Sequence, residues 1–170
     1  MSELGSSNDG QVSAIGESLS NYQHANDNRS VILVVDDSNT VLRSATDYLT
    51  NIGLTVVTAR DGFEALAKVV DIRPAMLFVD IMMPRLDGYQ ACALIKNNAD
   101  LRSIPVIILS SKDGLFDRAR GRVAGADDHL AKPFNAAQLT SMVEKYLNDK
   151  VLNLAANARD SGEVDTTTSS

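Results

Sequence analysis

Strand and helix patterns alternate five times along the middle of this chain, and this alternation limits the possible folds more than any other feature. The first strand is predicted at Val31–Val35, an unbroken apolar run typical of a strand buried on both faces. Further strands are expected at 54–58, 75–79, 104–109 and Asp128–Ala131. Apolar residues at helical spacing predict helices between Ser38 and Gly53, at Gly62–Ile72, and at 86–97, 116–123 and 136–147. Repeated βα units with short links predict an α/β fold, a parallel sheet with helices on both faces.

The folded unit is predicted to be shorter than the 170-residue chain. Residues 1–29 are rich in Ser, Asn, Gly and Asp, and we expect a disordered tail with one short helical pattern at 12–19. Residues 151–170 are likewise expected to be a disordered tail. One folded domain is therefore predicted at 30–150, close to the commonest domain size.

Composition excludes several classes of protein. The net charge of −6 argues against nonspecific nucleic-acid binding, which needs a basic surface. No apolar run reaches the roughly 18 residues of a membrane span, and the polar N-terminus lacks the pattern of a signal peptide. Cys92 is the one cysteine, so no internal disulfide can form, and we expect it to fill the core. A cytoplasmic location is predicted.

Polar residues follow the predicted strands at the points where the strands end. Asp36 and Asp37 follow the first strand, Asp80 the third and Ser110 the fourth, and the fifth leads to Lys132. In parallel sheets the working site lies at these carboxyl ends. Clustered carboxylates either raise a pKa or hold a cation, and an open oxygen-rich site suits Mg²⁺. With Lys132 and Ser110 to contact phosphoryl oxygens, a carboxylate nucleophile beside Mg²⁺ can accept phosphate as an acyl phosphate.

These segments resemble the receiver domain of two-component response regulators over about 31–148. The resemblance implies a flavodoxin-like sheet with strand order 2-1-3-4-5. It is carried by Val34-Val35-Asp36-Asp37-Ser38, by Phe78-Val79-Asp80-Ile81-Met82-Met83-Pro84 with Asp87-Gly88, by Pro105-Val106-Ile107-Ile108-Leu109-Ser110, and by Gly125-Ala126-Asp127-Asp128 through Ala131-Lys132-Pro133-Phe134.

The resemblance also implies a role for each site residue. Asp80 would be the phosphoacceptor, and Mg²⁺ would be held by Asp37, Asp80 and the backbone carbonyl of Met82. Asp36 would help to position the ion. The phosphoryl group would be contacted by Ser110 and Lys132, and the bond between Lys132 and Pro133 would be cis. The implied partners are a histidine kinase or histidine phosphotransfer domain and a downstream output protein.

A narrower resemblance lies in residues 80–97 and 110–117. Both segments are similar to the small response regulators of chemotaxis-like systems that control type IV pili and twitching motility. We therefore expect a single-domain response regulator whose output passes through a partner protein, since the residues after 150 are too few to fold into an output domain.

One position departs from the receiver pattern. Receivers usually have Tyr or Phe three residues before the lysine, where the ring turns inward when the switch hydroxyl moves. Here that position is His129. His129 either replaces the aromatic residue without consequence or takes part in the switch.

Two other functions compete with this interpretation. Haloacid-dehalogenase-like phosphatases also use an Asp nucleophile, Mg²⁺ and a lysine, but they need a second Asp two residues after the nucleophile. Ser38 follows Asp36 at that spacing, and Met82 follows Asp80. An inactive pseudo-receiver is disfavoured because every site residue is present. No glycine-rich nucleotide-binding loop follows the first strand.

Overall fold

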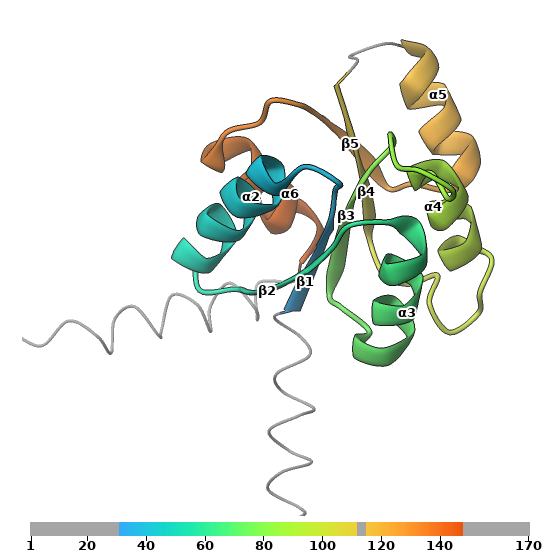
Figure 1. Ribbon diagram of the computed structural model, residues 1–170, viewed down its shortest axis with the longest axis horizontal. Coiled ribbons are helices and arrows are strands. Elements are labelled where there is room, and N and C mark those ends of the chain that lie inside the picture. Colours follow the sequence, from blue (N-terminus) through green and yellow to red (C-terminus); the bar gives the residue numbers. More distant parts are fainter. Residues whose placement is uncertain (1–30, 112–114, 148–170) are drawn as a thin grey trace, which may run out of the picture.

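The computed structural model describes residues 31–111 and 115–147, and within these ranges five strands and five helices alternate as predicted (Figure 1). In chain order they are β1 (Val31–Val35), α2 (Asn39–Asn51), β2 (Thr55–Ala59), α3 (Gly62–Ile72), β3 (Met76–Asp80), α4 (Gly88–Lys96), β4 (Val106–Ser110), α5 (Leu115–Ala124), β5 (Asp128–Ala131) and α6 (Ala136–Tyr146). The predicted tails 1–29 and 151–170 and the helical pattern at 12–19 lie outside the described residues. The limits of 30 and 150 for the folded unit therefore stay a prediction.

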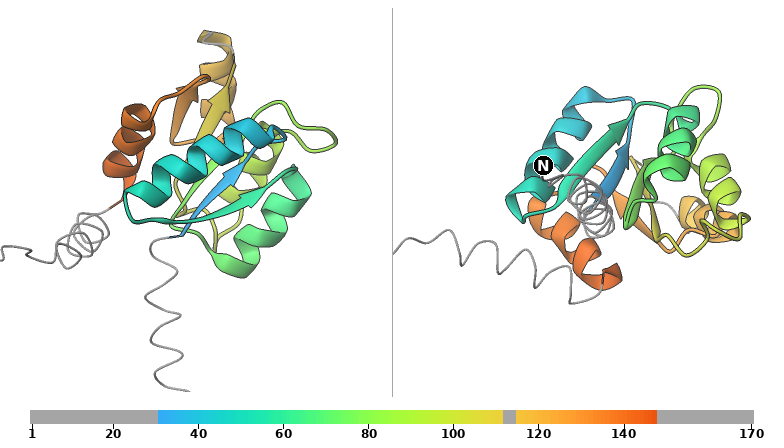
Figure 2. Two further views of the ribbon diagram at one scale, coloured as in Figure 1. Left: turned by 60° about the vertical axis from the view of Figure 1, so that its left-hand side comes forward. Right: turned by 90° about the horizontal axis from the view of Figure 1, so that it is seen from below.

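All neighbouring strands pair in parallel, in the order β2-β1-β3-β4-β5. The α/β class and the strand order are confirmed. Helices α2 and α6 cover one face of the sheet, and α3, α4 and α5 cover the other (Figure 2). Because every strand runs the same way, all five carboxyl ends lie along one edge of the sheet.

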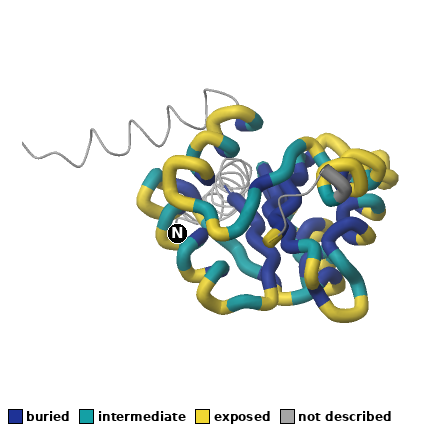
Figure 3. The backbone as a smooth tube through the Cα atoms, turned by 90° about the horizontal axis from the view of Figure 1, so that it is seen from above, coloured by how far each residue is buried: buried dark blue, intermediate teal, exposed yellow. Residues whose placement is uncertain are grey.

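Two apolar cores, one on each face of the sheet, explain why the central strands read as unbroken apolar runs. In β1, Ile32 and Val34 pack under α2 and α6, whereas Leu33 and Val35 pack under α3 and α4. Alternate side chains of a strand point to opposite faces, so a strand covered on both faces needs apolar residues at every position. The central strands are accordingly buried along their length (Figure 3).

Most element boundaries moved by one or two residues from their predicted positions. The predicted range of strand β4 is 104–109, but the strand lies at Val106–Ser110. It begins directly after Pro105, because proline has no N–H to donate to a neighbouring strand. Helix α4 was predicted from residue 86 but begins at Gly88. Its cap is Asp87, whose side chain accepts the Gln90 N–H while the Gln90 side chain accepts the Asp87 N–H.

Helix ends follow the predicted glycines. Gly53 and Gly125 have φ of 89° and 91°, and they follow α2 and α5 respectively. Ser38 caps α2 as predicted, accepting the Val41 N–H at 3.5 Å. Among the described residues, no helix has the length and apolar character required to cross a membrane.

Candidate functional site

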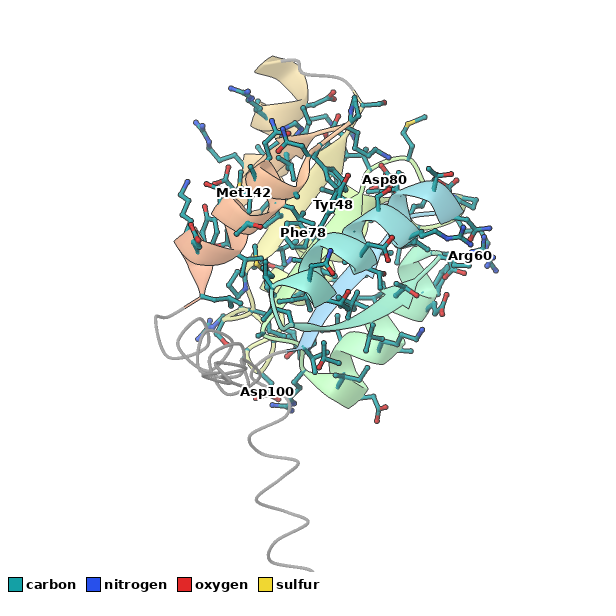
Figure 4. All side chains as sticks on the ribbon, turned by 90° about the vertical axis from the view of Figure 1, so that its left-hand side faces the viewer. Tyr48, Arg60, Phe78, Asp80, Asp100 and Met142 are labelled. Carbon is teal, nitrogen blue, oxygen red and sulfur yellow. The ribbon has the colours of Figure 1, made fainter. Side chains whose placement is uncertain are left out.

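Three carboxylates meet at the carboxyl edge of the sheet. Asp36 and Asp37 directly follow β1, and Asp80 is the last residue of the neighbouring strand β3. One carboxylate oxygen from each lies within 4.8 Å of those of the other two. Asp36 is fully buried and Asp80 is 2% exposed, whereas Asp37 is exposed. Figure 4 shows Asp80 at the opposite end of the fold from Asp100, which precedes β4. The cluster is therefore deep on one side and open to solvent at Asp37.

Lys132 reaches this cluster from the loop after β5. Its Nζ lies 3.0 Å from Asp36 Oδ2 and 2.9 Å from Asp80 Oδ1. The Lys132–Pro133 peptide bond is cis, as the resemblance implied. Two buried carboxylates need a nearby cation, since burial of an unpaired charge costs on the order of several kcal/mol. Lys132 is that cation in this structure.

The pKa values of the pair reflect burial and mutual attraction. Burial raises the pKa of Asp80, Lys132 opposes this by bonding to the carboxylate, and the charge of Asp36 raises it further. For Lys132, burial lowers the pKa, but the contacts with Asp80 and Asp36 outweigh burial and leave it above the ordinary value. Lys132 is therefore charged at neutral pH, and Asp80 binds a proton more readily than an ordinary aspartate.

The donor atoms of the cluster fit a hard divalent cation. Asp36 has both oxygens engaged, because Oδ1 accepts the Ser38 N–H at 2.9 Å and Oδ2 pairs with Lys132. Asp80 Oδ1 is buried and lies 2.9 Å from Lys132 Nζ, the cation that pairs with it. Carboxylate oxygens with an open side suit Mg²⁺, which keeps several of its waters. Asp80 and the exposed Asp37 would hold the ion directly, with Asp36 behind them.

A hollow of about 480 Å³ lies at the mouth of the cluster. Its wall includes Asp37 and the loop after β3, in which the Met82 side chain is 71% exposed. The predicted role of the Met82 carbonyl as a ligand stays a prediction. The hollow leaves the Asp37 side of the cluster open to solvent.

Gly88, the first residue of α4, allows this helix to approach the site closely. A Cβ at Gly88 would collide with the backbone carbonyl oxygen of Asp80. The Gly88 N–H donates to the Ile81 carbonyl at 3.2 Å, which ties the helix to the loop. The sequence reasoning noted Gly88 only as part of a motif; the glycine that follows a capping Asp was the available signal.

Ser110 lies at the end of β4 and is 3% exposed. Its carbonyl accepts the Lys132 N–H at 2.7 Å, so the two predicted phosphoryl contacts are joined through the backbone. Its hydroxyl donates to Asp117 Oδ2 at 3.5 Å, and the Tyr89 hydroxyl donates to the Asp117 carbonyl at 3.2 Å. Sequence reasoning missed Asp117 and Tyr89, because no local motif links residues 28 positions apart.

His129 lies in β5, opposite Ile108 of β4, and is partly buried. It lines a hollow of about 310 Å³ together with Arg118, Arg122 and Asp128. The histidine therefore faces α5, on the side of the sheet opposite to Leu130, which packs under α2 and α6. The structure leaves its role in switching as a prediction.

Most of the described core matches the model of a known protein family. The model for the response regulator receiver domain matches residues 32–144. Protein PilG of Pseudomonas aeruginosa is 55% identical over 116 residues, which cover 68% of this chain and 86% of PilG. Response regulator MprA of Mycobacterium ulcerans is 40% identical over 116 residues, and the chain spans about half of its length, 49%.

Solved structures agree with the sequence matches. The chemotaxis response regulator CheY4 of Vibrio cholerae superposes with a TM-score of 0.66 at 29% identity, covering 69% of this chain and 98% of CheY4. The receiver domain of NtrX from Brucella abortus superposes with a TM-score of 0.64 at 32% identity, covering 68% of this chain and 97% of that domain.

Proposed function

The chain belongs to the response regulator receiver domain family, and on this premise we propose that it accepts a phosphoryl group on Asp80 and signals by a change of conformation. The donor would be a histidine kinase or a histidine phosphotransfer domain, and the receiver of the signal a downstream protein. One observation carries the proposal. A buried aspartate at the end of β3 has Lys132 2.9 Å away and two further carboxylates around it.

The chemistry follows from the groups around Asp80. An oxygen of the Asp80 carboxylate attacks phosphorus, the bond from phosphorus to the donor imidazole nitrogen breaks, and that nitrogen keeps the electron pair. Mg²⁺ held by Asp37 and Asp80 would supply positive charge opposite the phosphoryl oxygens. Lys132 pairs with a phosphoryl oxygen once the Asp80 charge is lost.

The signal would leave through Ser110. Its hydroxyl has one hydrogen, and donation to a phosphoryl oxygen draws the end of β4 toward Asp80. This movement would repack the face formed by α5, β5 and α6, where His129 lies. The new charge and the new hydrogen bond bias a two-state element, as in other phosphorylation switches.

Mass spectrometry after incubation with acetyl phosphate and Mg²⁺ tests the acceptor. We expect one added phosphate on the wild-type protein, none on Asp80→Asn, and none without Mg²⁺. Asp71→Asn, which removes an exposed carboxylate of α3, is the matched control and should be labelled like the wild type. Equal labelling of Asp80→Asn would move the acceptor elsewhere.

The same site argues against an enzyme that turns over a substrate. Receiver domains are not conventional enzymes, and at most a slow loss of the phosphoryl group from Asp80 itself is proposed here. The phosphatase alternative needs a second Asp two residues after the nucleophile, but Met82 has that position. Steady hydrolysis of p-nitrophenyl phosphate would revive this alternative.

We also propose a role in type IV pilus and twitching-motility control, acting in the cytoplasm. The support is the 55% identity to PilG together with the sequence of the loop after β3. Expression in a Pseudomonas aeruginosa strain without PilG tests it, with the width of the twitching zone as the measurement. The wild-type chain should widen the zone and Asp80→Asn should not. No effect of either chain would contradict this cellular role while leaving phosphorylation of Asp80 intact.

A further inference from the structure

Hydrogen bonds connect the switch hydroxyl of Ser110 to a tyrosine on another helix. The Ser110 hydroxyl donates to Asp117 Oδ2 at 3.5 Å. Tyr89 donates its hydroxyl hydrogen to the Asp117 carbonyl at 3.2 Å, and the hydroxyl oxygen lies 3.4 Å from Asp117 Oδ1. The three residues belong to β4, α5 and α4, so Asp117 joins the carboxyl edge of the sheet to the contact between two helices.

Tyr89 forms the wall of a groove between α4 and α5. The residue is 7% exposed, and the Arg120 guanidinium lies over its ring, 4.7 Å from the centroid. Both residues line a mainly apolar hollow of about 430 Å³, which also includes Ala93, Ala119 and Val123. We call this hollow the α4–α5 groove. Val123 at its rim is 90% exposed, so the groove opens to solvent.

A competition for one hydrogen links this groove to the phosphoryl group. A serine hydroxyl has a single O–H to donate. When the Ser110 hydrogen goes to a phosphoryl oxygen on Asp80, the bond to Asp117 must break. At 3.5 Å that bond is long, so little free energy holds it in the unphosphorylated state. The Asp117 carboxylate then loses this donor, so its position relative to Tyr89 is less restrained.

We propose that Asp117 and Tyr89 are positioning residues that couple the Ser110 hydroxyl to the α4–α5 groove, so that phosphorylation of Asp80 alters the groove. The proposal rests on the proposed function of Asp80 and Ser110. It adds a route on the α4 side of α5 to the expected change on the face of α5, β5 and α6. Such a second route matters in a chain with His129 in place of the usual aromatic residue.

The state of Tyr89 supports this arrangement. Burial raises the pKa of Tyr89, and the charge of Asp117 raises it further. The hydroxyl therefore keeps its hydrogen throughout the neutral range and stays a donor to Asp117. Because both hydroxyls lie against Asp117, a change at Ser110 reaches Tyr89 through a single residue.

Methyl NMR on the full chain tests the coupling without adding a reporter residue. Ala93 in the α4–α5 groove and Val123 at its rim supply methyl signals, and Leu49 in the core under α2 supplies a reference. Mg²⁺ and beryllofluoride, an unreactive phosphoryl mimic, are added, and the bound fluoride signals report occupancy of the site. We expect the Ala93 and Val123 signals to shift on binding and the Leu49 signal to stay.

The variants separate the coupling from the site itself. Tyr89→Phe removes the hydroxyl but keeps the ring, and it should lose at least half of the shift at Ala93 and Val123. Ser110→Ala should lose it as well, compared at a beryllofluoride concentration at which the fluoride signals show that its site is occupied. Tyr48→Phe, which removes a hydroxyl from α2, is the matched control and should keep the whole shift.

The binding constant gives a second readout. Tyr89→Phe loosens Asp117 without changing any charge, so the Ser110 hydroxyl is released more easily. Loss of one weak hydrogen bond should tighten beryllofluoride binding by about two- to fivefold. A merely structural role for Tyr89 would weaken binding instead.

Three results would overturn the proposal: a full groove shift in Tyr89→Phe, a full shift in Ser110→Ala, or weaker binding in Tyr89→Phe. Failure of wild-type protein to bind beryllofluoride would instead contradict the proposed function. The fluoride signals distinguish these two failures, because the coupling is judged only in samples whose site is occupied.

Discussion

Lys132→Met should destabilise the protein far more than removal of a surface lysine that lies at a similar distance from its own carboxylate partner. Lys132 Nζ lies 2.9 and 3.0 Å from two carboxylates that are almost completely buried. Lys145 Nζ lies 2.7 Å from Asp128, but its side chain is 62% exposed. Breaking a buried pair leaves an unpaired charge in the interior, whereas solvent screens an exposed one. Because the N···O distances are similar, the comparison of the two variants tests the effect of burial.

The expected loss is about 3 to 4 kcal/mol in the free energy of unfolding for Lys132→Met at pH 7. The loss cannot exceed about 4 kcal/mol, because that is the cost of protonating a carboxyl of ordinary Asp pKa at pH 7, and protonation removes the unpaired charge. Burial already raises the pKa of Asp80, so in the variant this carboxyl takes up the proton. Removal of Lys132 raises that pKa further.

The sign of the pH dependence follows. Folded Lys132→Met holds a proton on Asp80 that the unfolded chain lacks, so its stability increases as the pH falls toward the unfolded-state pKa. The difference in the free energy of unfolding between Lys132→Met and the wild type should therefore be about 2 to 3 kcal/mol smaller at pH 5 than at pH 7. Mg²⁺ should also stabilise Lys132→Met more than the wild type, because the ion replaces the missing cation.

Urea unfolding at pH 7 and pH 5, with EDTA or with Mg²⁺, measures all three effects. The wild type and Lys145→Met are unfolded beside Lys132→Met. Equal losses for the two lysine variants, or a gap that widens at pH 5, would refute the argument that Lys132 balances buried carboxylates.

Three further predictions follow from single residues. Gly88→Ala should lower the free energy of unfolding in urea by about 1 to 3 kcal/mol, because the new Cβ meets the Asp80 carbonyl. Gly121→Ala inside α5 meets only ordinary contacts and should be neutral or stabilising, so equal effects of the two substitutions would contradict the close approach at Gly88. Cys92 is buried with its pKa raised to about 11, so iodoacetamide at pH 8 should label it only after unfolding, and fast labelling of the native protein would contradict its burial. As the pH is lowered from 8 to 5, the Mg²⁺ affinity measured by calorimetry should begin to fall at a higher pH than it would for ordinary carboxylates, because burial raises the pKa of Asp80. An affinity that stays constant down to pH 5 would count against Asp80 as a ligand.

The parts of the site that could be predicted depend on the direction of the strands. Once apolar runs and helical spacings indicated a parallel sheet, Asp36, Asp80 and Ser110 had to lie along one edge. That step needs no knowledge of side-chain positions. Lys132 follows by the same argument, because it comes directly after β5.

Burial and contact within the site could not be predicted in this way. Asp36 is fully buried while its neighbour Asp37, at the bend after β1, is exposed. The partner that makes the burial of Asp36 tolerable is Lys132, 96 residues later. Asp117 was missed for the same reason, because its contacts with Ser110 and Tyr89 exist only after three elements have packed.

The charges of the site explain why a neutral hydroxyl is the best candidate for the switch. Asp36, Asp37 and Asp80 contribute three negative charges and Lys132 one positive charge, so a divalent cation would bring the balance to zero. The proposed phosphorylation would remove the charge of the Asp80 carboxylate and add phosphoryl charge beside it. Lys132 would have an anionic partner before and after, and only a difference in how it stabilises the two states would shift the equilibrium. The single hydrogen of Ser110 differs, because it can go to Asp117 or to the phosphoryl group but not to both. On the proposed function, the conformational signal would therefore begin at Ser110.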